Sequence, residues 1–180
     1  LNATANGTGL LVRDNDHYQT SFEDGQGSVG EWAARTAGTH GNALGVSICA
    51  SANAYEQTAV TTTSGTEALG QTDISVTDAS TINVGDIVNF GETFEYETTA
   101  RNTTTNTITI KLKDDVNGAG LQSQITSGTN IRRRWRFYDL FDGAPGSSDY
   151  ATQNQRGSND EIHIVVYDTE GDISGFSVDA

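Results

Sequence analysis

Cysteine, proline, positive charge and long apolar runs are all scarce in this chain of 180 residues. Its one cysteine, Cys49, cannot form an internal disulfide, so a disulfide scaffold is excluded. No apolar run approaches the roughly 20 residues that a membrane-spanning helix needs. Lysine and arginine together number 10 against 24 acidic residues, and the net charge of −14 disfavours binding to nucleic acid or to an anionic membrane surface.

Methionine is absent as well, and the chain begins at Leu1. Natural full-length chains usually begin with methionine, so we expect an excised piece of a longer protein. Hydrophobic residues make up 34%, which is low for one large core, and threonine, serine, asparagine and glycine fill the difference. This composition favours a β-rich chain with many turns. Cys49 follows the alternating Val46 and Ile48, so we expect it to be a small buried residue of a strand.

The segment 27–49 predicts a short capped helix, a glycine-containing loop and a strand. Ser28 and Glu31 have the spacing of a capping box, in which each side chain bonds a backbone N–H of the first turn. Gly38 is placed to end this helix. The segment has neither a nucleophile paired with a base nor the spacing of metal ligands, so we interpret it as architecture.

The residues before this segment give weaker patterns. Residues 1–9 are polar and are expected to lack regular structure, whereas residues 10–13 predict a short strand. Asp14 is placed to cap a short helix in which Tyr18 and Phe22 pair at positions i and i+4.

The pattern changes at Thr58, where threonine becomes frequent and apolar residues recur at every second position. Residues 93–101 and 106–113 are predicted to pair as a hairpin across a turn. Several short strands at this spacing are typical of a small antiparallel barrel or sandwich. We therefore expect residues 58–131 to form an inserted β domain whose ends lie close together.

The residues after the β domain, from 132 onward, are expected to pack with the first segment of the chain. Residues 139–159 read as a long loop, and loops of this length are usually functional or mobile. Residues 162–167 are apolar on both faces except at His163, which is typical of a central strand in a parallel or mixed sheet. We expect His163 to be a hydrogen-bonded structural residue. Residues 1–57 and 132–180 are accordingly expected to build one mixed α/β unit around the inserted domain.

Two stretches resemble a known family. The first is the pattern A-R-x-x-G-x-x-G-N-x-L at 34–44, followed by a V-x-I strand, and the second combines 135–148 (WRFYDLFDGAPGSS) with 159–175 (NDEIHIVVYDTEGDISG). Both resemble the contractile tail sheath protein of T4-like myophages, especially those of marine cyanobacteria, and they occur in the family's order. One departure is Ala37, where the family pattern leads us to expect proline.

The resemblance implies a structural subunit, not an enzyme, with no catalytic residues and no cofactor or metal. Such subunits stack in hexameric rings around a tail tube and contract to drive it through the host envelope. The implied location is the virion tail, assembled in the host cytoplasm. The implied partners are other copies, the tail tube protein and the baseplate and tail terminator proteins, without direct contact to nucleic acid or membrane. The implied fold is a sheath unit in two segments, interrupted by the β domain on the outer surface.

An arginine cluster is the main candidate for a subunit interface. It holds four of the 10 basic residues, namely Arg132, Arg133, Arg134 and Arg136. Alternation predicts that Ile131, Trp135 and Phe137 share one strand face and that Arg132, Arg134 and Arg136 share the other. That stripe either docks on acidic surface of a neighbouring copy or pairs with local carboxylates, and both alternatives stay open. His40, in the glycine-containing loop, is a further candidate contact.

Two other functions are considered from the sequence. An acidic extracellular adhesin or carbohydrate-binding module would use exposed aromatic residues, with Trp32, Trp135, Tyr96 and Tyr150 as candidates, although we expect both tryptophans in cores. A hydrolase would use paired carboxylates. The acidic pairs lie in turn-like polar stretches, so we interpret them as turn charge; they are Glu23–Asp24, Asp114–Asp115 and Asp160–Glu161.

Overall fold

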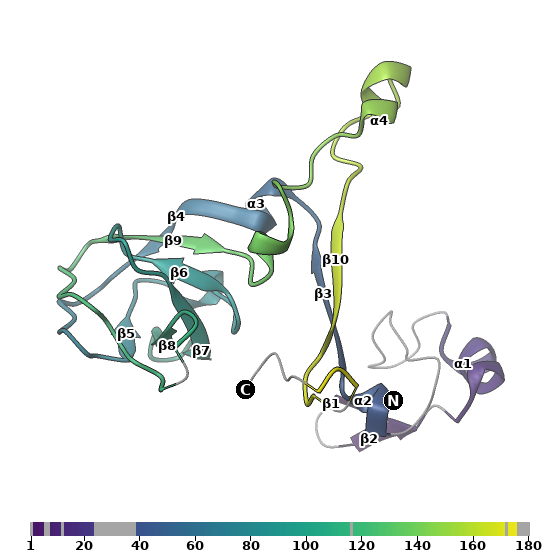
Figure 1. Ribbon diagram of the computed structural model, residues 1–180, viewed down its shortest axis with the longest axis horizontal. Helices are drawn as coiled ribbons and strands as arrows, with labels where there is room; N and C mark the ends of the chain where they lie inside the picture. The colour runs from purple at the N-terminus through teal and green to yellow at the C-terminus, as the bar shows by residue number, and fades with distance from the viewer. Residues whose placement is uncertain are drawn as a thin grey trace. The chain divides into compact units, whose positions relative to one another are not determined.

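The computed structural model describes residues 2–5, 8–11, 13–23, 39–115, 117–171 and 173–175. Within these ranges the chain is mixed α+β, and its strands pair antiparallel, as Figure 1 shows. The chain divides into two compact units, Leu1–Ile48 with Ile164–Ala180, and Cys49–His163. Each unit is described by itself below.

The first unit begins with a hairpin of β1 (Asn2–Ala5) and β2 (Thr8–Leu11). The expectation of irregular structure over residues 1–9 is therefore wrong for the described residues of this range, because Asn2–Ala5 pairs with Thr8–Leu11. Helix α1 (Asn15–Ser21) follows, and the Asp14 carboxylate caps it by accepting a bond of 2.8 Å from the His17 amide, as predicted. The capped helix expected from Ser28 lies outside the described residues.

A two-stranded ribbon forms the rest of the described first unit. Helix α2 (Thr39–Asn42) leads into β3 (Leu44–Cys49), which pairs with β10 (His163–Asp168). The Thr169 amide donates to the Ala43 carbonyl at 2.7 Å, and Gly45 lies against the ring of Tyr167. In these two contacts the residue number rises from 43 to 45 on the β3 side and falls from 169 to 167 on the β10 side, so the two strands are antiparallel. The strand at 162–167 exists as predicted, but its expected place at the centre of a parallel or mixed sheet is wrong.

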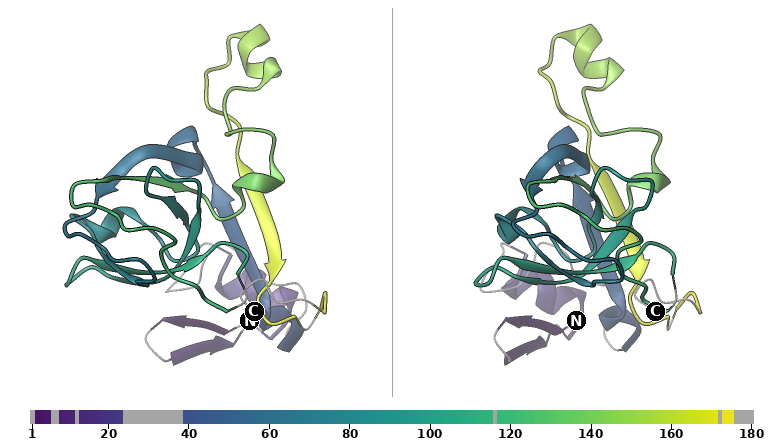
Figure 2. Two further views of the ribbon diagram at one scale, coloured as in Figure 1. Left: turned by 60° about the vertical axis from the view of Figure 1, so that its left-hand side comes forward. Right: turned by 90° about the vertical axis from the view of Figure 1, so that its left-hand side faces the viewer.

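The second unit is built on a closed barrel of six strands. The strand order is β4-β9-β6-β7-β8-β5, and a bridge between Thr63 and Val76 joins the two outer strands. The Ser64 amide donates to the Ser75 carbonyl at 2.9 Å at this seam. Figure 2 shows the strands enclosing the barrel interior. The strands are β4 (Glu56–Thr62), β5 (Asp73–Ser75), β6 (Ile87–Asn89), β7 (Tyr96–Asn102), β8 (Thr107–Leu112) and β9 (Asn130–Arg134).

The predicted hairpin is confirmed by the pairing of β7 with β8, in which Tyr96 lies opposite Leu112 and Asn102 opposite Thr107. Asn106, with φ of 51°, supplies the left-handed residue that the turn needs. Of the two expected architectures, barrel and sandwich, the structure has the barrel. Its strands begin at Glu56 and end at Arg134, which brackets the range 58–131 expected for the inserted domain.

The barrel interior is filled by aliphatic side chains and two aromatic rings. Tyr96 is fully buried, and its hydroxyl donates to Glu92 Oε1 at 2.7 Å and accepts from the Gln122 amide at 3.0 Å. Both roles of this hydroxyl are satisfied, so its hydrogen bonds offset the cost of removing it from water. The core consists of Ile74, Val76, Ala79, Ile82, Val88, Phe90, Tyr96, Ile108, Ile110, Leu121, Ile125 and Ile131.

Short helical turns connect the barrel to its surroundings. Helix α3 (Ala52–Tyr55) precedes β4, and the 3-10 turns η1 (Ala79–Thr81) and η2 (Tyr138–Leu140) lie in loops. The long loop expected at 139–159 contains a helix of its own, α4 (Asp149–Asn154).

Candidate interaction surfaces

The predicted arginine stripe lies on the outside of the barrel, where carboxylates of the same unit pair with it. Arg132 and Arg134 on β9 both bond Glu56 on β4, with distances of 2.6 Å from Arg132 Nε to Oε1 and 3.3 Å from Arg134 Nε to Oε2. Arg134 Nη1 also bonds Glu95 Oε1 at 2.6 Å. Arg136 Nη2 lies 3.3 Å from Glu97 Oε1. We call these residues the ion-pair face.

Geometry explains why these pairs form. Register places Arg134 and Glu97 on either side of Ile87, which is the residue of β6 between them, and Ile87 is buried although it is on the outer side. The pairs Arg134–Glu95 and Arg136–Glu97 therefore join the two sides of the short strand β6. Partly exposed pairs of this kind contribute roughly 0–1 kcal/mol each. Within this unit the arginine stripe therefore pairs with local carboxylates. Contact of the ion-pair face with a neighbouring copy stays a prediction.

Arg133 differs from the other arginines because it points inward. Its side chain is 9% exposed, its Nη1 lies 3.4 Å from Asp86 Oδ2, and its Nη2 donates to the Asn53 carbonyl at 2.6 Å. The Arg133 Nε is buried without a hydrogen-bond partner among the described residues. Burial raises the pKa of the Asp86 carboxyl, and bonds from the Asn83 amide and the nearby Arg133 act against that rise. Alternation with Ile131 and Trp135 could have predicted this inward position from the sequence.

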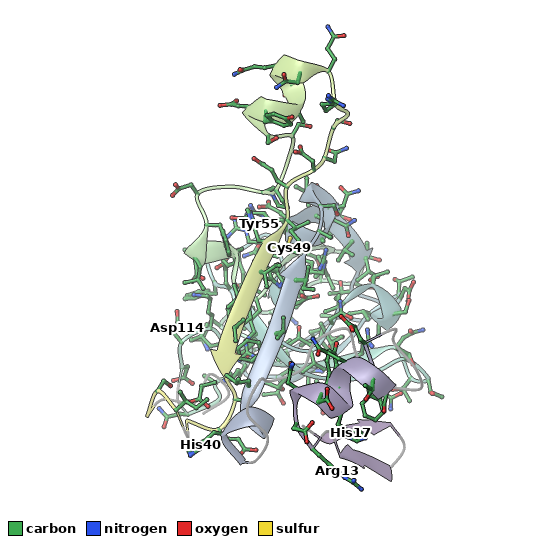
Figure 3. All side chains as sticks on the ribbon, turned by 90° about the vertical axis from the view of Figure 1, so that its right-hand side faces the viewer. Arg13, His17, His40, Cys49, Tyr55 and Asp114 are labelled. Carbon is green, nitrogen blue, oxygen red and sulfur yellow. The ribbon has the colours of Figure 1, made fainter. Side chains whose placement is uncertain are left out.

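His40 lies in α2, exposed, at the end of the ribbon where β3 begins (Figure 3). It belongs to the first unit, whereas the arginines belong to the second. Its role at an interface stays a prediction.

An aromatic cluster occupies the end of the second unit where Cys49 and Tyr55 lie (Figure 3). The His163 ring stacks on Phe141 with centroids 3.9 Å apart, and its Nε2 donates to the Gly143 carbonyl at 2.8 Å. The Trp135 side chain is buried, with 6% of the residue exposed, and its ring centroid lies 5.6 Å from that of Phe141. The structural, hydrogen-bonded role predicted for His163 and the buried position of Trp135 are confirmed.

Cys49 is fully buried, and its Sγ donates to the Ser51 carbonyl at 3.5 Å. Burial raises the pKa of the thiol, so it stays protonated near neutral pH and behaves as the small apolar residue that the sequence predicts.

An open pocket of about 490 Å³ lies on the barrel surface. The exposed ring of Phe94 and the side chain of Leu112 are its apolar part. Three carboxylates, Glu92, Glu95 and Asp114, and two cations, Lys113 and Arg132, also line it. Each of these five side chains already bonds a partner within the unit. Sequence reasoning missed this pocket, because its residues come from three separate segments of the chain.

The ribbon carries an exposed apolar face. Gly45 lies opposite Tyr167, and their side-chain positions share one face of the ribbon. Because side chains alternate along a strand, the residues next to Gly45 on β3 and next to Tyr167 on β10 point to the opposite face. The apolar side chains of that face are Leu44, Val46, Ile48, Ile164 and Val166, and the buried Asp168 lies at its end. We call the five apolar residues the apolar ribbon face. Val166 is 61% exposed and Ile48 is 42% exposed. The two-sided burial expected for residues 162–167 is therefore wrong, because in the described structure only β3 pairs with β10.

The described residues contain no group of three or more histidine, cysteine, aspartate or glutamate side chains arranged to hold a metal ion. Among the helices in the same ranges, none has the length and apolar character needed to cross a membrane.

The acidic pairs Asp114–Asp115 and Asp160–Glu161 lie in turns and loops, as expected, and three of these carboxylates also bond the backbone. The pair Glu23–Asp24 lies partly outside the described residues. The Asp115 carboxylate accepts from the Ala119 amide at 2.6 Å, and Asp160 and Glu161 both bond backbone amides of residues 146–148. These carboxylates stabilise loops, which is a role other than the acid–base chemistry of a hydrolase.

Comparison of the chain with known protein families, with curated proteins and with solved structures found no match. The function is therefore argued from the residues and surfaces described above.

Proposed function

We propose that this chain forms part of a structural subunit of a contractile phage tail sheath, which polymerises around the tail tube and contracts to drive it through the host envelope. The observation that carries the proposal is the apolar ribbon face. Its side chains are aliphatic, and four of them, Leu44, Ile48, Ile164 and Val166, are exposed on two adjacent strands, whereas Val46 is half-buried.

Such a surface is costly in a chain that acts alone. A two-stranded ribbon is marginally stable in water unless a further strand or a helix packs on it. Contiguous exposed apolar patches mark sites where other polypeptide docks. Permanent assemblies have interfaces more hydrophobic than transient ones. An assembly subunit would bury this face, which supports a structural role.

The resemblance to sheath proteins falls on the same elements. The pattern at 34–44 leads directly into β3, and the segment 159–175 contains β10. In the proposed layout the ribbon belongs to a sheath unit made of residues 1–57 and 132–180, and the barrel is the insertion. Other copies, the tail tube protein and the baseplate and tail terminator proteins are the proposed partners, and the virion tail is the proposed location. Catalysis and cofactors have no part in this proposal.

Electron microscopy of the full protein that carries this chain tests the proposal. The wild-type protein is expected to form tubes or stacked rings of uniform width. Val166→Asp is expected to prevent their formation, because it places a charge on the apolar ribbon face at a position that is already 61% exposed. Circular dichroism checks that the variant subunit stays folded.

A matched control is Leu69→Asp, which changes a barrel residue that is 68% exposed and lies outside the ribbon. This variant is expected to assemble like the wild type. Dispersed subunits of the wild-type protein at every concentration, or tubes of Val166→Asp indistinguishable from the wild type, would contradict the proposal.

The second candidate function, an adhesin or carbohydrate-binding module, has one favourable observation. Tyr150 is 67% exposed on α4. Tyr96 and Trp135, however, are buried in the barrel and in the aromatic cluster, and Trp32 lies outside the described residues. Sugar binding usually needs exposed rings, so this candidate is weaker. Binding of the chain to a glycan array would support the adhesin or carbohydrate-binding function.

A further inference from the structure

A structured arm projects from the second unit. The arm consists of residues 144–161, with α4 at its end, and each view in Figures 1 and 2 shows α4 standing away from the barrel. The arm is separate from the ribbon on which the proposed function depends.

Reciprocal bonds hold the two sides of the arm together. The Gly146 amide donates to Glu161 Oε2 at 2.9 Å, and the Glu161 amide donates to the Gly146 carbonyl at 3.1 Å. Both oxygens of Asp160 accept from Ser148, one from its amide at 2.8 Å and one from its hydroxyl at 2.7 Å. These bonds keep the pKa of the Asp160 carboxyl below its usual range, so the arm is bonded in this way at neutral pH.

The end of the arm is equally well defined. Ser148 Oγ caps α4 by accepting from the Ala151 amide at 3.1 Å. Gln155 ends the helix in the left-handed conformation, and the Arg156 amide donates back to the Ala151 carbonyl at 3.0 Å. A segment fixed in this way has little conformational freedom left to lose on binding.

This ordered arm presents two side chains suited to recognition. Tyr150 is 67% exposed, although tyrosine is a residue type that usually contributes strongly when buried at interfaces. Arg156 is exposed, and its guanidinium has no partner among the described residues. Most other described basic side chains bond carboxylates or carbonyls within the chain, namely Arg101, Lys111, Lys113, Arg132, Arg133, Arg134 and Arg136.

The pocket on the barrel has complementary chemistry. Phe94 offers an exposed ring. Glu92 already accepts from the Tyr96 and Ser123 hydroxyls, and Glu95 from Arg134 and the Tyr138 hydroxyl, so Asp114 is the most exposed carboxylate of the pocket. The Asp114 side chain is 83% exposed. Figure 3 shows Asp114 on the barrel, well separated from α4 in the same unit, so the arm does not fill the pocket of its own chain.

We propose that the arm inserts into the pocket of a second copy, with Tyr150 against Phe94 and Arg156 beside the exposed carboxylate of Asp114. The two surfaces differ, so this contact is head-to-tail, and a head-to-tail contact builds rings or filaments. The net charge of −14 means that copies otherwise repel one another, and an unpaired arginine at the contact offsets part of that repulsion. The inference rests on the proposed function, because it assumes a chain that assembles with itself.

Complementation between two variants tests this contact. Arg156→Glu removes the function of the arm and leaves the pocket intact, whereas Phe94→Asp removes the function of the pocket and leaves the arm intact. Sedimentation and NMR titration of the chain at low salt are expected to show self-association of the wild type that weakens by about tenfold or more in either variant. An equal mixture of the two variants is expected to form heterodimers and no larger species, since one intact arm meets one intact pocket.

Two controls make the result specific. Arg13→Glu reverses an exposed cation outside the arm, and Leu69→Asp changes an exposed apolar residue outside the pocket. Both are expected to associate like the wild type. A wild type that stays monomeric up to millimolar concentration, variants that associate unchanged, or a mixture without heterodimers would overturn the inference. None of these results bears on the apolar ribbon face, which the tube-forming experiment tests separately.

Discussion

The buried pair of Arg133 and Asp86 provides the sharpest test of the barrel energetics. Arg133→Met removes the charge and keeps much of the side-chain volume. The variant leaves the Asp86 carboxylate with the Asn83 amide, at 2.8 Å, as its remaining bond among those that the structure describes. Removing one partner of a buried ion pair costs about 3–5 kcal/mol. The separation of 3.4 Å is long for such a pair, so we expect a loss near the lower value.

Arg132→Met is the matched control, because it makes the same change one residue away on the opposite face of β9. The pair of Arg132 with Glu56 has side chains that are 35% and 28% exposed. A pair of this exposure contributes at most about 1 kcal/mol. The two variants therefore separate the effect of burial from the effect of losing an arginine.

Urea denaturation followed by tryptophan fluorescence measures both losses, with Trp32→Phe in every variant so that Trp135 reports on the barrel alone. At pH 7 the free energy of unfolding should fall by about 3 kcal/mol for Arg133→Met and by less than about 1 kcal/mol for Arg132→Met. Equal losses, or a loss below about 1 kcal/mol for Arg133→Met, would refute the reasoning.

The pH dependence of the free energy of unfolding tests the same pair in a second way. A carboxyl whose pKa is raised in the folded state favours folding most at low pH, and this contribution is lost as pH rises through the raised pKa. Arg133 acts against the rise, so its removal raises the pKa of Asp86 further. The deficit of Arg133→Met is therefore expected to be smaller at pH 5 than at pH 7. A deficit that grows on acidification would contradict this assignment.

Two further predictions concern the first unit. Gly45→Ala should speed amide exchange in the ribbon, because a Cβ at this position would lie 2.5 Å from the ring of Tyr167, whereas Gly143→Ala, with nothing within 4 Å, should have little effect. Unchanged exchange in Gly45→Ala would show that the ring moves aside without cost. Asp168 accepts from the amides of Gly171 and Ser174 after β10, and bonds to Ser174, Ile173 and Gly171 lower the pKa of its carboxyl. The turn should therefore stay ordered down to about pH 4 and loosen only as pH falls through that lowered pKa. The amide chemical shifts of Gly171 and Ser174, followed by NMR as the pH is lowered, report this loosening. Loosening already at pH 5 would contradict the prediction.

Local patterns predicted those parts of the fold that local interactions determine. The hairpin of β7 and β8 depends on alternation and on a turn residue in the left-handed conformation, and both are visible in the sequence. The cap of α1 depends on one carboxylate and one amide three residues apart. The burial of Trp135 follows from its alternation with Arg134 and Arg136, and the burial of Cys49 agrees with the apolar character of its side chain.

Burial that depends on distant segments could not be predicted in the same way. Residues 162–167 have the composition of a strand covered on both faces, yet coverage depends on what packs there, and in the described residues only β3 pairs with β10. The pocket likewise depends on the closure of the barrel, which brings Phe94, Lys113 and Arg132 together. The inward position of Arg133 was not predicted, although its alternation with Ile131 indicates it.

The seam of the barrel has a consequence for assembly at high concentration. Strand edges that remain unpaired recruit strands from other chains, and this recruitment leads to aggregation. The bridge between Thr63 and Val76 and the bond between the hydroxyls of Thr62 and Thr77 leave β4 and β5 joined to each other. A barrel closed in this way offers no unpaired edge of β4 or β5 at its seam. In the proposed assembly, strand pairing at the seam would therefore not compete with contacts at the ribbon and the arm.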